Sequence, residues 1–114
     1  MFRLILTALL GCSLLCAMAP ISRPLAPANA RAGAWTASEV TVTWADNSPN
    51  EDGFIIEFST DGKVFVEKGR AGEHATSYRV RGLTSNTAYS FRVRAYNGVG
   101  WSDPSNVASG RTKP

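Results

Sequence analysis

Alternating apolar and polar residues mark several short segments of the chain as β-strands. Segment 40–44 reads VTVTW, with threonines between apolar side chains, and segment 54–58 reads FIIEF. The longest such run covers residues 89–96 and is apolar at its odd-numbered positions, YSFRVRAY. Because successive side chains of a strand point to opposite faces, this period of two predicts strands buried on one face and solvated on the other.

Weaker runs extend the pattern along the chain. Strands are also expected at residues 64–66, 78–81 and 106–112, and a seventh would precede Thr36. No long helical period follows Pro27. Six to seven short strands separated by turn residues indicate an all-β fold, an antiparallel β-sandwich.

Turn-forming residues separate these runs. Asp61-Gly62 lies between residues 54–58 and 64–66 and is the strongest short hairpin signal in the chain. Loops are expected at residues 46–53, 70–76 and 97–105. These segments either are rich in Asn, Asp, Ser, Gly or Pro, or show no alternation of apolar and polar residues.

The first 30 residues have the parts of a secretory signal peptide. One arginine precedes an apolar run over residues 4–19, and small residues flank a cleavage site at Ala28-Asn29-Ala30. Two alternatives stay open: an uncleaved membrane anchor, and a lipidated Cys12, since residues 9–12 (LLGC) resemble a bacterial lipoprotein box. We therefore expect residues 1–30 to be a signal peptide or membrane leader, residues 31–114 to be one domain, and the protein to be secreted or held in the cell envelope.

Removing the leader changes what the composition implies. The whole chain has 12 basic and 9 acidic residues, but Arg3 and Arg23 belong to the leader, which leaves ten basic residues against nine acidic ones. A net charge of +1 gives no reason to expect a nucleic-acid partner, and a membrane contact is expected only through an uncleaved or lipidated leader. Both cysteines, Cys12 and Cys16, also lie in the leader, so the domain must be stable without disulfides.

Residues after the leader resemble a fibronectin type III domain of the kind common in exported bacterial proteins. The similarity runs from about Pro27 to Thr112. Its marks are residues 40–44 (VTVTW), 50–54 (NEDGF), 82–89 (GLTSNTAY), 91–97 (FRVRAYN) and 102–106 (SDPSN). Each piece is weak alone, and their order and spacing carry the resemblance.

The resemblance implies an immunoglobulin-like sandwich and structural roles for three residues. Trp44 is similar to the tryptophan that fills the space between the two sheets. Leu83 would close one end of the core. Tyr89 would be the tyrosine corner, whose hydroxyl hydrogen-bonds the backbone near Leu83 and Thr84.

The same resemblance conflicts with the cleavage site. It places the first strand at about residues 28–34, starting near residue 27, so that a cut after Ala30 would fall inside the strand. Either the signal peptide is cut earlier, or the first strand is short and loosely held.

No catalytic or cofactor-binding constellation is evident in the domain. Its only histidine, His74, lies in a loop and is expected to be solvated. Residues 48–53 resemble the opening of a calcium loop, but Ser59 stands where the bidentate glutamate would be, so a polar turn is expected instead. We expect no enzyme activity, no cofactor and no metal.

The most informative surface feature is a tryptophan in a turn-rich loop. Trp101 lies in NGVGWSDPS, between the last two strands, where binding members of this family often contact partners. Trp101-Ser102 also resembles half of the Trp-Ser-x-Trp-Ser motif of cytokine receptors, in which tryptophans stack between arginines. Arg92 and Arg94 are expected on the outer face with Glu57, so Trp101 either stacks on one of these arginines or is held out for a partner.

These residues predict a non-enzymatic binding or interaction module. The candidate binding surface comprises Trp101, Tyr96, Ile55, Trp35, Arg92 and Arg94. The partner would be a protein or a polysaccharide. A passive structural or spacer element, and a polysaccharide-binding accessory to a secreted glycoside hydrolase, are the alternatives, because this fold carries many unrelated functions.

Overall fold

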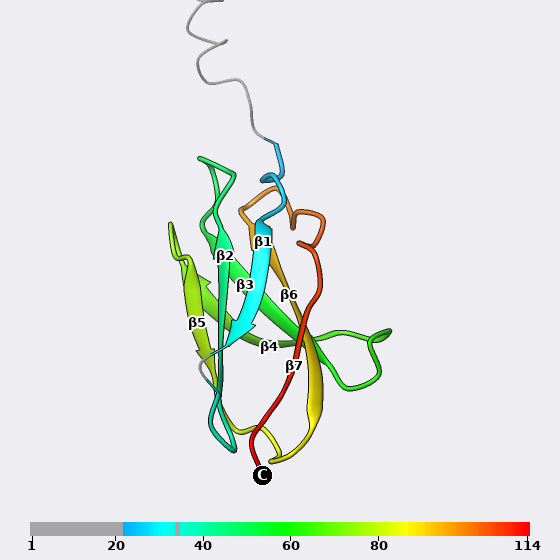
Figure 1. Ribbon diagram of the computed structural model, residues 1–114. Coiled ribbons are helices and arrows are strands. Elements are labelled where there is room, and N and C mark those ends of the chain that lie inside the picture. The colour runs from blue at the N-terminus through cyan, green and yellow to red at the C-terminus, as the bar shows by residue number, and fades with distance from the viewer. Residues whose placement is uncertain (1–21, 34) are drawn as a thin grey trace, which may run out of the picture.

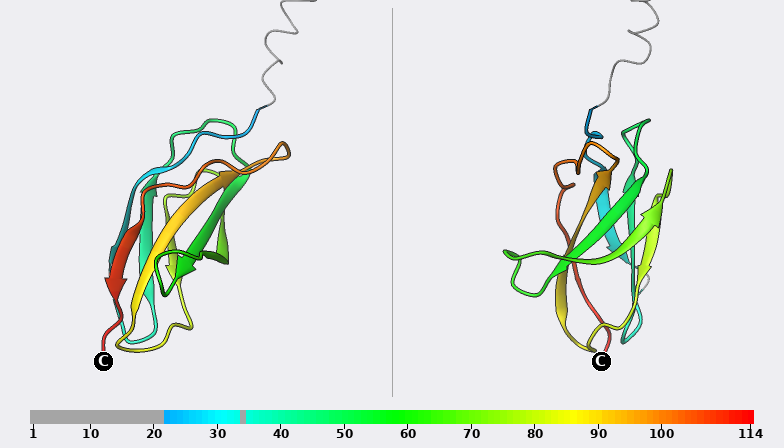
Figure 2. Two further views of the ribbon diagram at one scale, coloured as in Figure 1. Left: turned by 90° about the vertical axis from the view of Figure 1, so that its right-hand side faces the viewer. Right: turned by 180° about the vertical axis from the view of Figure 1, so that it is seen from behind.

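Two antiparallel sheets pack face to face in the computed structural model, which describes residues 22–33 and 35–114. The apolar run of residues 4–19 lies outside the described residues. The three-stranded sheet has the order β1-β2-β5 and the four-stranded sheet the order β4-β3-β6-β7 (Figures 1 and 2). The strands are β1 (Ala28–Gly33), β2 (Val40–Ala45), β3 (Gly53–Ser59), β4 (Val66–Gly72), β5 (Ser77–Val80), β6 (Ala88–Tyr96) and β7 (Ala108–Arg111). The fold is thus the all-β sandwich that the alternation predicts.

The core lies between the sheets and is built from one face of each central strand. In β6 the odd-numbered residues from Tyr89 to Ala95 are buried, and the even-numbered ones from Ser90 to Tyr96 are only partly buried. Trp44 is buried, and its ring lies 5.3 Å from that of Phe54 across the sandwich. Burying side chains of this size contributes roughly 1.5–3 kcal/mol each, which is the main source of stability in a domain without disulfides.

Tyr89 and Leu83, which the family resemblance assigns to the core, are both buried. The Tyr89 hydroxyl accepts a hydrogen bond of 2.9 Å from the backbone N–H of Thr84. Thr112, also buried, adds a second tie at this end, because its hydroxyl donates to the Thr84 carbonyl at 2.6 Å. Together these bonds fasten the crossing from β5 to β6.

The hairpin between β3 and β4 differs from the one predicted. Residues 60–65 form a longer loop that projects from the sandwich (Figure 1), and β4 begins only at Val66. Asp61 organises this loop, since its Oδ1 accepts backbone N–H bonds from Lys63 and Val64 at 2.8 and 2.9 Å. The backbone hydrogen bonds from Val64 and Lys63 are the main reason why the pKa of Asp61 is lowered to about 2. Asp61-Gly62 therefore marks a wide turn, and β4 runs through residues 70–72, which the sequence pattern assigned to a loop.

Strand β1 includes the cleavage site considered above. It pairs antiparallel with β2, with a register shift between Ala28 and Arg31. Asn106 holds it on the other side, since its side chain accepts from the Ala30 N–H at 2.8 Å and donates to the Ala30 carbonyl at 3.1 Å. A cut after Ala30 would remove Ala30 from the domain and break its hydrogen bonds to Asn106.

Residues 22–27 lie at the end of the sandwich opposite the C-terminus, beside the β2–β3 and β6–β7 loops (Figure 1). Asn50 and Asn97 each donate a side-chain hydrogen bond to the carbonyl of Ser22, at 3.1 and 2.8 Å. Among the described residues, no helix has the length and hydrophobicity needed to cross a bilayer.

Candidate functional site

A layer of arginine, glutamate and aromatic side chains covers the outer face of the four-stranded sheet. The register pairs Glu57 of β3 with Arg92 of β6, and Ile55 of β3 with both Arg94 of β6 and Arg70 of β4. Directly opposed residues in an antiparallel sheet share a face, so these side chains form one continuous outer layer.

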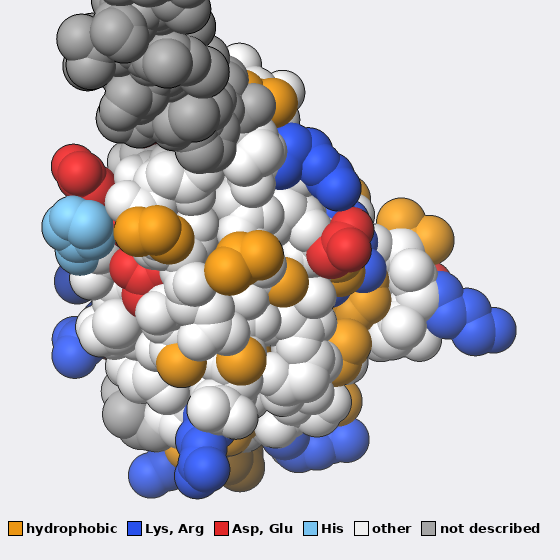
Figure 3. All heavy atoms as spheres, turned by 90° about the horizontal axis from the view of Figure 1, so that it is seen from above, with side chains coloured by type: hydrophobic (Ala, Val, Ile, Leu, Met, Phe, Trp, Pro, Cys, Tyr) orange, Lys and Arg blue, Asp and Glu red, His pale blue; other side chains and the backbone are white. Residues whose placement is uncertain are grey.

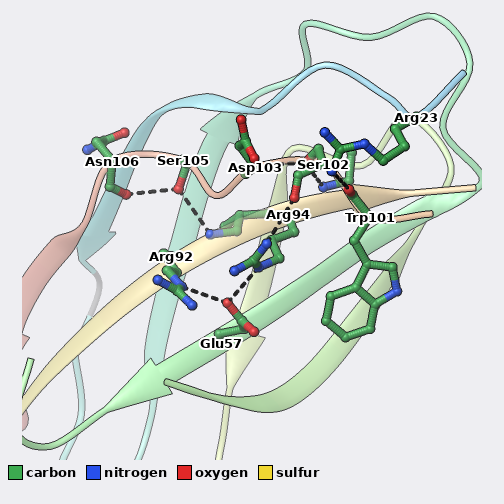
Figure 4. A network of polar contacts seen from close by, with 11 residues as sticks. Arg23, Glu57, Arg92, Arg94, Trp101, Ser102, Asp103, Ser105 and Asn106 are labelled. Carbon is green, nitrogen blue, oxygen red and sulfur yellow. Dashed lines mark hydrogen bonds and ion pairs between the residues drawn. The ribbon is translucent and has the colours of Figure 1, made fainter. Parts of the chain in front are cut away.

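Glu57 is the centre of this layer. Its Oε1 accepts hydrogen bonds from Nε of Arg92 at 2.7 Å and from Nε of Arg94 at 3.1 Å (Figure 4). The glutamate side chain is only 8% exposed and both arginines are 23% exposed, so these ion pairs are shielded from solvent. The predicted placement of the three residues on one face is confirmed, but the face is partly buried instead of fully solvated.

The two arginines also hold neighbouring loops. The guanidinium of Arg92 lies 4.3 Å from the ring centroid of Phe65, at the base of the 60–65 loop. Nη1 of Arg94 donates to the carbonyl of Ser102 at 3.0 Å. Both arginines, expected on the binding surface, are thus engaged in fixing the loops on either side of the sheet.

Two serines position the segment after Trp101 along β6. The hydroxyls of Ser102 and Ser105 accept the backbone N–H groups of Ala95 and Val93, at 2.9 and 3.0 Å (Figure 4). In return, their own N–H groups donate to the carbonyls of the same two residues, both at 2.8 Å. Residues 102–106 are a family mark in the sequence, but the sequence alone does not predict this role of the two hydroxyls.

Trp101 extends from this segment on the side of the sheet where Glu57 and Arg94 lie (Figure 4). It forms a β-bridge with Tyr96, and Nη1 of Arg23 donates to its carbonyl at 2.9 Å. Its side chain nevertheless has a large free area, since the residue is 40% exposed. The backbone is fixed while much of the indole stays open to solvent.

The stack predicted for Trp101 has a different partner. Arg70 of β4 places its guanidinium 5.8 Å from the Trp101 ring centroid and 5.0 Å from that of Tyr96. The prediction of Arg92 or Arg94 was wrong because Glu57 and the neighbouring loops occupy those guanidinium groups. Arg70 was missed because residues 67–72 (EKGRAG) show no alternation, and only pairing with β3 identifies them as a strand.

Glu67 fixes the orientation of Arg70. Its two carboxylate oxygens accept from Nε and Nη2 of Arg70 at 2.7 and 3.1 Å, a bidentate pair three residues apart. The hydrogen bond from Arg70 lowers the pKa of Glu67, and the reciprocal bond raises the pKa of Arg70. The guanidinium therefore stays charged and is presented beside the two aromatic rings.

Two other residues of the expected binding surface, Ile55 and Trp35, are not available for contact in the way predicted. Ile55 is completely buried although it is on the outer face, so its prediction as a contact residue was wrong. Its register partners Arg70 and Arg94 are long side chains that can cover it. Trp35 is partly buried, and its ring lies against the backbone of Gly110, where any side chain would clash with the indole.

We use the term Trp101 surface for the three side chains Trp101, Tyr96 and Arg70. They are contributed by β4, by the last residue of β6 and by the loop after it. The surface has two aromatic rings and one fixed cation, which suits contact with a partner.

Comparisons with known proteins identify the fold and its relatives. The family model of the fibronectin type III domain matches residues 25–111. Mouse contactin-5 is 34% identical over 93 residues, which cover 77% of this chain and 8% of contactin-5. Human roundabout homolog 2 is 38% identical over 77 residues, which cover 64% of this chain and 6% of that protein.

Solved structures give the same result. Titin domains superpose with a TM-score of 0.71 at 29% identity, covering 80% of this chain and 32% of theirs. The fibronectin type III domain of a human protein, fibronectin type III domain containing protein 3, gives a TM-score of 0.69 at 28% identity, covering 84% and 92%. The chain belongs to the fibronectin type III domain family.

Proposed function

We propose that this chain is an exported, non-enzymatic module that binds a protein through the Trp101 surface. The observation that carries the proposal is the exposure of Trp101 on a rigid support. Its backbone is bridged to Tyr96, and the residue is 40% exposed beside Arg70. Tryptophan, tyrosine and arginine are the residues most enriched among the side chains that dominate binding energy at protein interfaces.

The support around these side chains favours binding over a purely structural role. Holding a side chain in its bound orientation lowers the entropy lost on association. Glu67 orients Arg70, and Ser102 fixes the backbone directly after Trp101. The partner's complementary surface would present an apolar patch for the indole and an acceptor for the guanidinium.

Export is the second part of the proposal. The apolar run of residues 4–19 and its arginine support a signal peptide or membrane leader within residues 1–30. The contacts of Ala30 with Asn106 favour a cut upstream of β1, or a retained leader, over a cut after Ala30. The leader supports export alone, and the bacterial type stays a prediction, since the relatives described above come from mouse and human. Mass spectrometry of the exported protein would locate its N-terminus, and an N-terminus at Arg31 would contradict a cut upstream of β1.

The test of binding is affinity capture from envelope and secreted fractions with the 114-residue chain as bait. Trp101→Ala and Arg70→Ala should each reduce the captured protein at least about tenfold. Val107→Ala, which shortens another exposed apolar side chain, should leave capture unchanged.

Other outcomes would contradict protein binding or its location at the Trp101 surface. Capture of no protein would favour a passive structural or spacer element. Retardation in polysaccharide-containing native gels, without protein capture, would favour an accessory to a glycoside hydrolase. Equal capture by all three variants would place the binding site away from Trp101.

A further inference from the structure

Two carboxylates and the only histidine meet at the end of the sandwich that carries the Trp101 loop. Asp46 and Glu51 belong to the connection between β2 and β3, and His74 to the turn between β4 and β5. Seen from above, the imidazole lies at the edge of the molecule with acidic side chains close by (Figure 3). The sequence gives no sign of this cluster, because 23 residues separate Glu51 from His74.

The distances within the cluster suit a small divalent ion. Nδ1 of His74 lies 3.0 Å from Oε2 of Glu51 and 3.8 Å from Oδ2 of Asp46. One donor atom from each residue falls within 4.8 Å of the others. Ligands that bind zinc at about 2.0–2.2 Å are separated from one another by roughly 3–3.5 Å, so the distances from His74 to the two carboxylates are close to the required spacing.

The carboxylate of Glu51 provides an independent indication of a missing partner. Its side chain is 0% exposed, and Oε2 accepts the backbone N–H of His74 at 2.9 Å. Oε1 is also buried and has no hydrogen-bond partner among the described residues. A buried carboxylate oxygen without a partner is costly, and a cation bound at the Glu51 carboxylate would offset this cost.

We propose that Asp46, Glu51 and His74 form a binding site for a divalent transition-metal ion of the zinc type. Zinc binds both imidazole nitrogen and carboxylate oxygen, and the imidazole favours a transition-metal ion over calcium or magnesium. Calcium is disfavoured, since it takes six to eight oxygen ligands. Three protein ligands leave a coordination position for water or for a partner's side chain. The proposal is independent of protein binding by the Trp101 surface.

The chain offers variants that remove ligands with little disturbance. His74 has a φ of 63° in the turn closed by the hydrogen bond from Ala75 to Gly72. Asparagine tolerates this left-handed conformation, so His74→Asn removes the imidazole and keeps the backbone. Asp46→Asn keeps the Oδ1 that accepts the Ser48 N–H at 3.0 Å and removes the charged oxygen facing His74.

The experiment is calorimetric titration of zinc into the 114-residue chain, prepared without a histidine tag. Cys12→Ser and Cys16→Ser are included in every sample, because cysteine thiolates would bind zinc themselves. We expect one saturable site per chain, and a higher melting temperature with zinc than with calcium or magnesium. His74→Asn and Asp46→Asn should each weaken zinc binding at least about tenfold. Asp52→Asn, an exposed loop aspartate outside the cluster, should leave it unchanged.

Three results would overturn the proposal. The first is the absence of saturable zinc binding up to millimolar concentration, which would leave the contact between His74 and Glu51 with a structural role only. The second is unchanged zinc affinity in His74→Asn, since this residue is largely exposed and its replacement is compatible with folding. The third is unchanged affinity in a folded Asp46→Asn protein.

Discussion

The two faces of strand β6 use side chains in opposite ways. On the inner face Tyr89, Phe91, Val93 and Ala95 are buried in the apolar core. On the outer face Arg92, Arg94 and Tyr96 lie in a polar and aromatic layer that is only partly buried. Both faces are packed, but only the inner one is almost entirely shielded from water. This difference suggests that the inner face determines whether the domain folds, and that the outer face determines how the loops are presented.

The inner face should show the largest effect of substitution. Trp44→Ala should lower the free energy of unfolding by about 3–5 kcal/mol, because it removes a buried ring that packs on Phe54. Urea denaturation measures this loss. Trp101→Ala is the matched control, and an equal loss in both variants would contradict the distinction between the two faces.

Glu57 should be the most sensitive position of the outer layer. Glu57→Gln should lower the free energy of unfolding by about 1.5–3 kcal/mol, since it removes a charged acceptor shared by Arg92 and Arg94. Glu67→Gln is the control, because Glu67 pairs with Arg70 in a much more exposed setting and should cost less than about 1 kcal/mol. Urea midpoints that do not separate the two variants would show that burial of the Glu57 pairs is unimportant.

Tyr89→Phe should cost about 1–3 kcal/mol. The substitution removes only the hydroxyl and leaves the backbone N–H of Thr84 without its acceptor. Tyr78→Phe is a suitable control, because the Tyr78 hydroxyl has no hydrogen bond to another described residue. Equal thermal melts for Tyr89→Phe and the parent would remove the tyrosine-corner assignment and leave the sandwich in place.

The contact between Trp101 and Arg70 should contribute least to stability. A double-mutant cycle with Trp101→Ala and Arg70→Ala should give a coupling energy of about 0.5–1 kcal/mol, the size expected for an exposed cation–π contact. The corresponding cycle between Trp101 and Arg92 should give a coupling near zero. Larger coupling to Arg92 would restore the partner expected from the sequence.

Alternation predicts the inner face well. It identifies β2, β3 and β6 and places Trp44 and Phe54 in the core, because period two directly reports burial on one face. The same rule places Glu57 with Arg92 and Arg94. It fails at β4, because glycines and charged residues there do not alternate with apolar ones. Only the pairing with β3 identifies this segment as a strand.

The candidate sites are harder to predict because they are assembled by tertiary structure. Arg70 meets Trp101 only because β4 lies beside β3, and Ile55 is buried on a nominally exposed face. The hydroxyls of Ser102 and Ser105 substitute for backbone acceptors along β6, a role that depends on the path of the loop. Residue type and spacing alone carry none of this information.

The most direct test of the account compares binding and stability in one variant. Trp101→Ala and the parent chain would be measured for affinity to the captured protein by interferometry, with urea midpoints determined on the same preparations. We expect at least about tenfold weaker binding of Trp101→Ala, with a loss of stability of no more than about 1 kcal/mol. Unchanged affinity would contradict binding through the Trp101 surface. A stability loss close to that of Trp44→Ala would show that Trp101 belongs to the core of the fold.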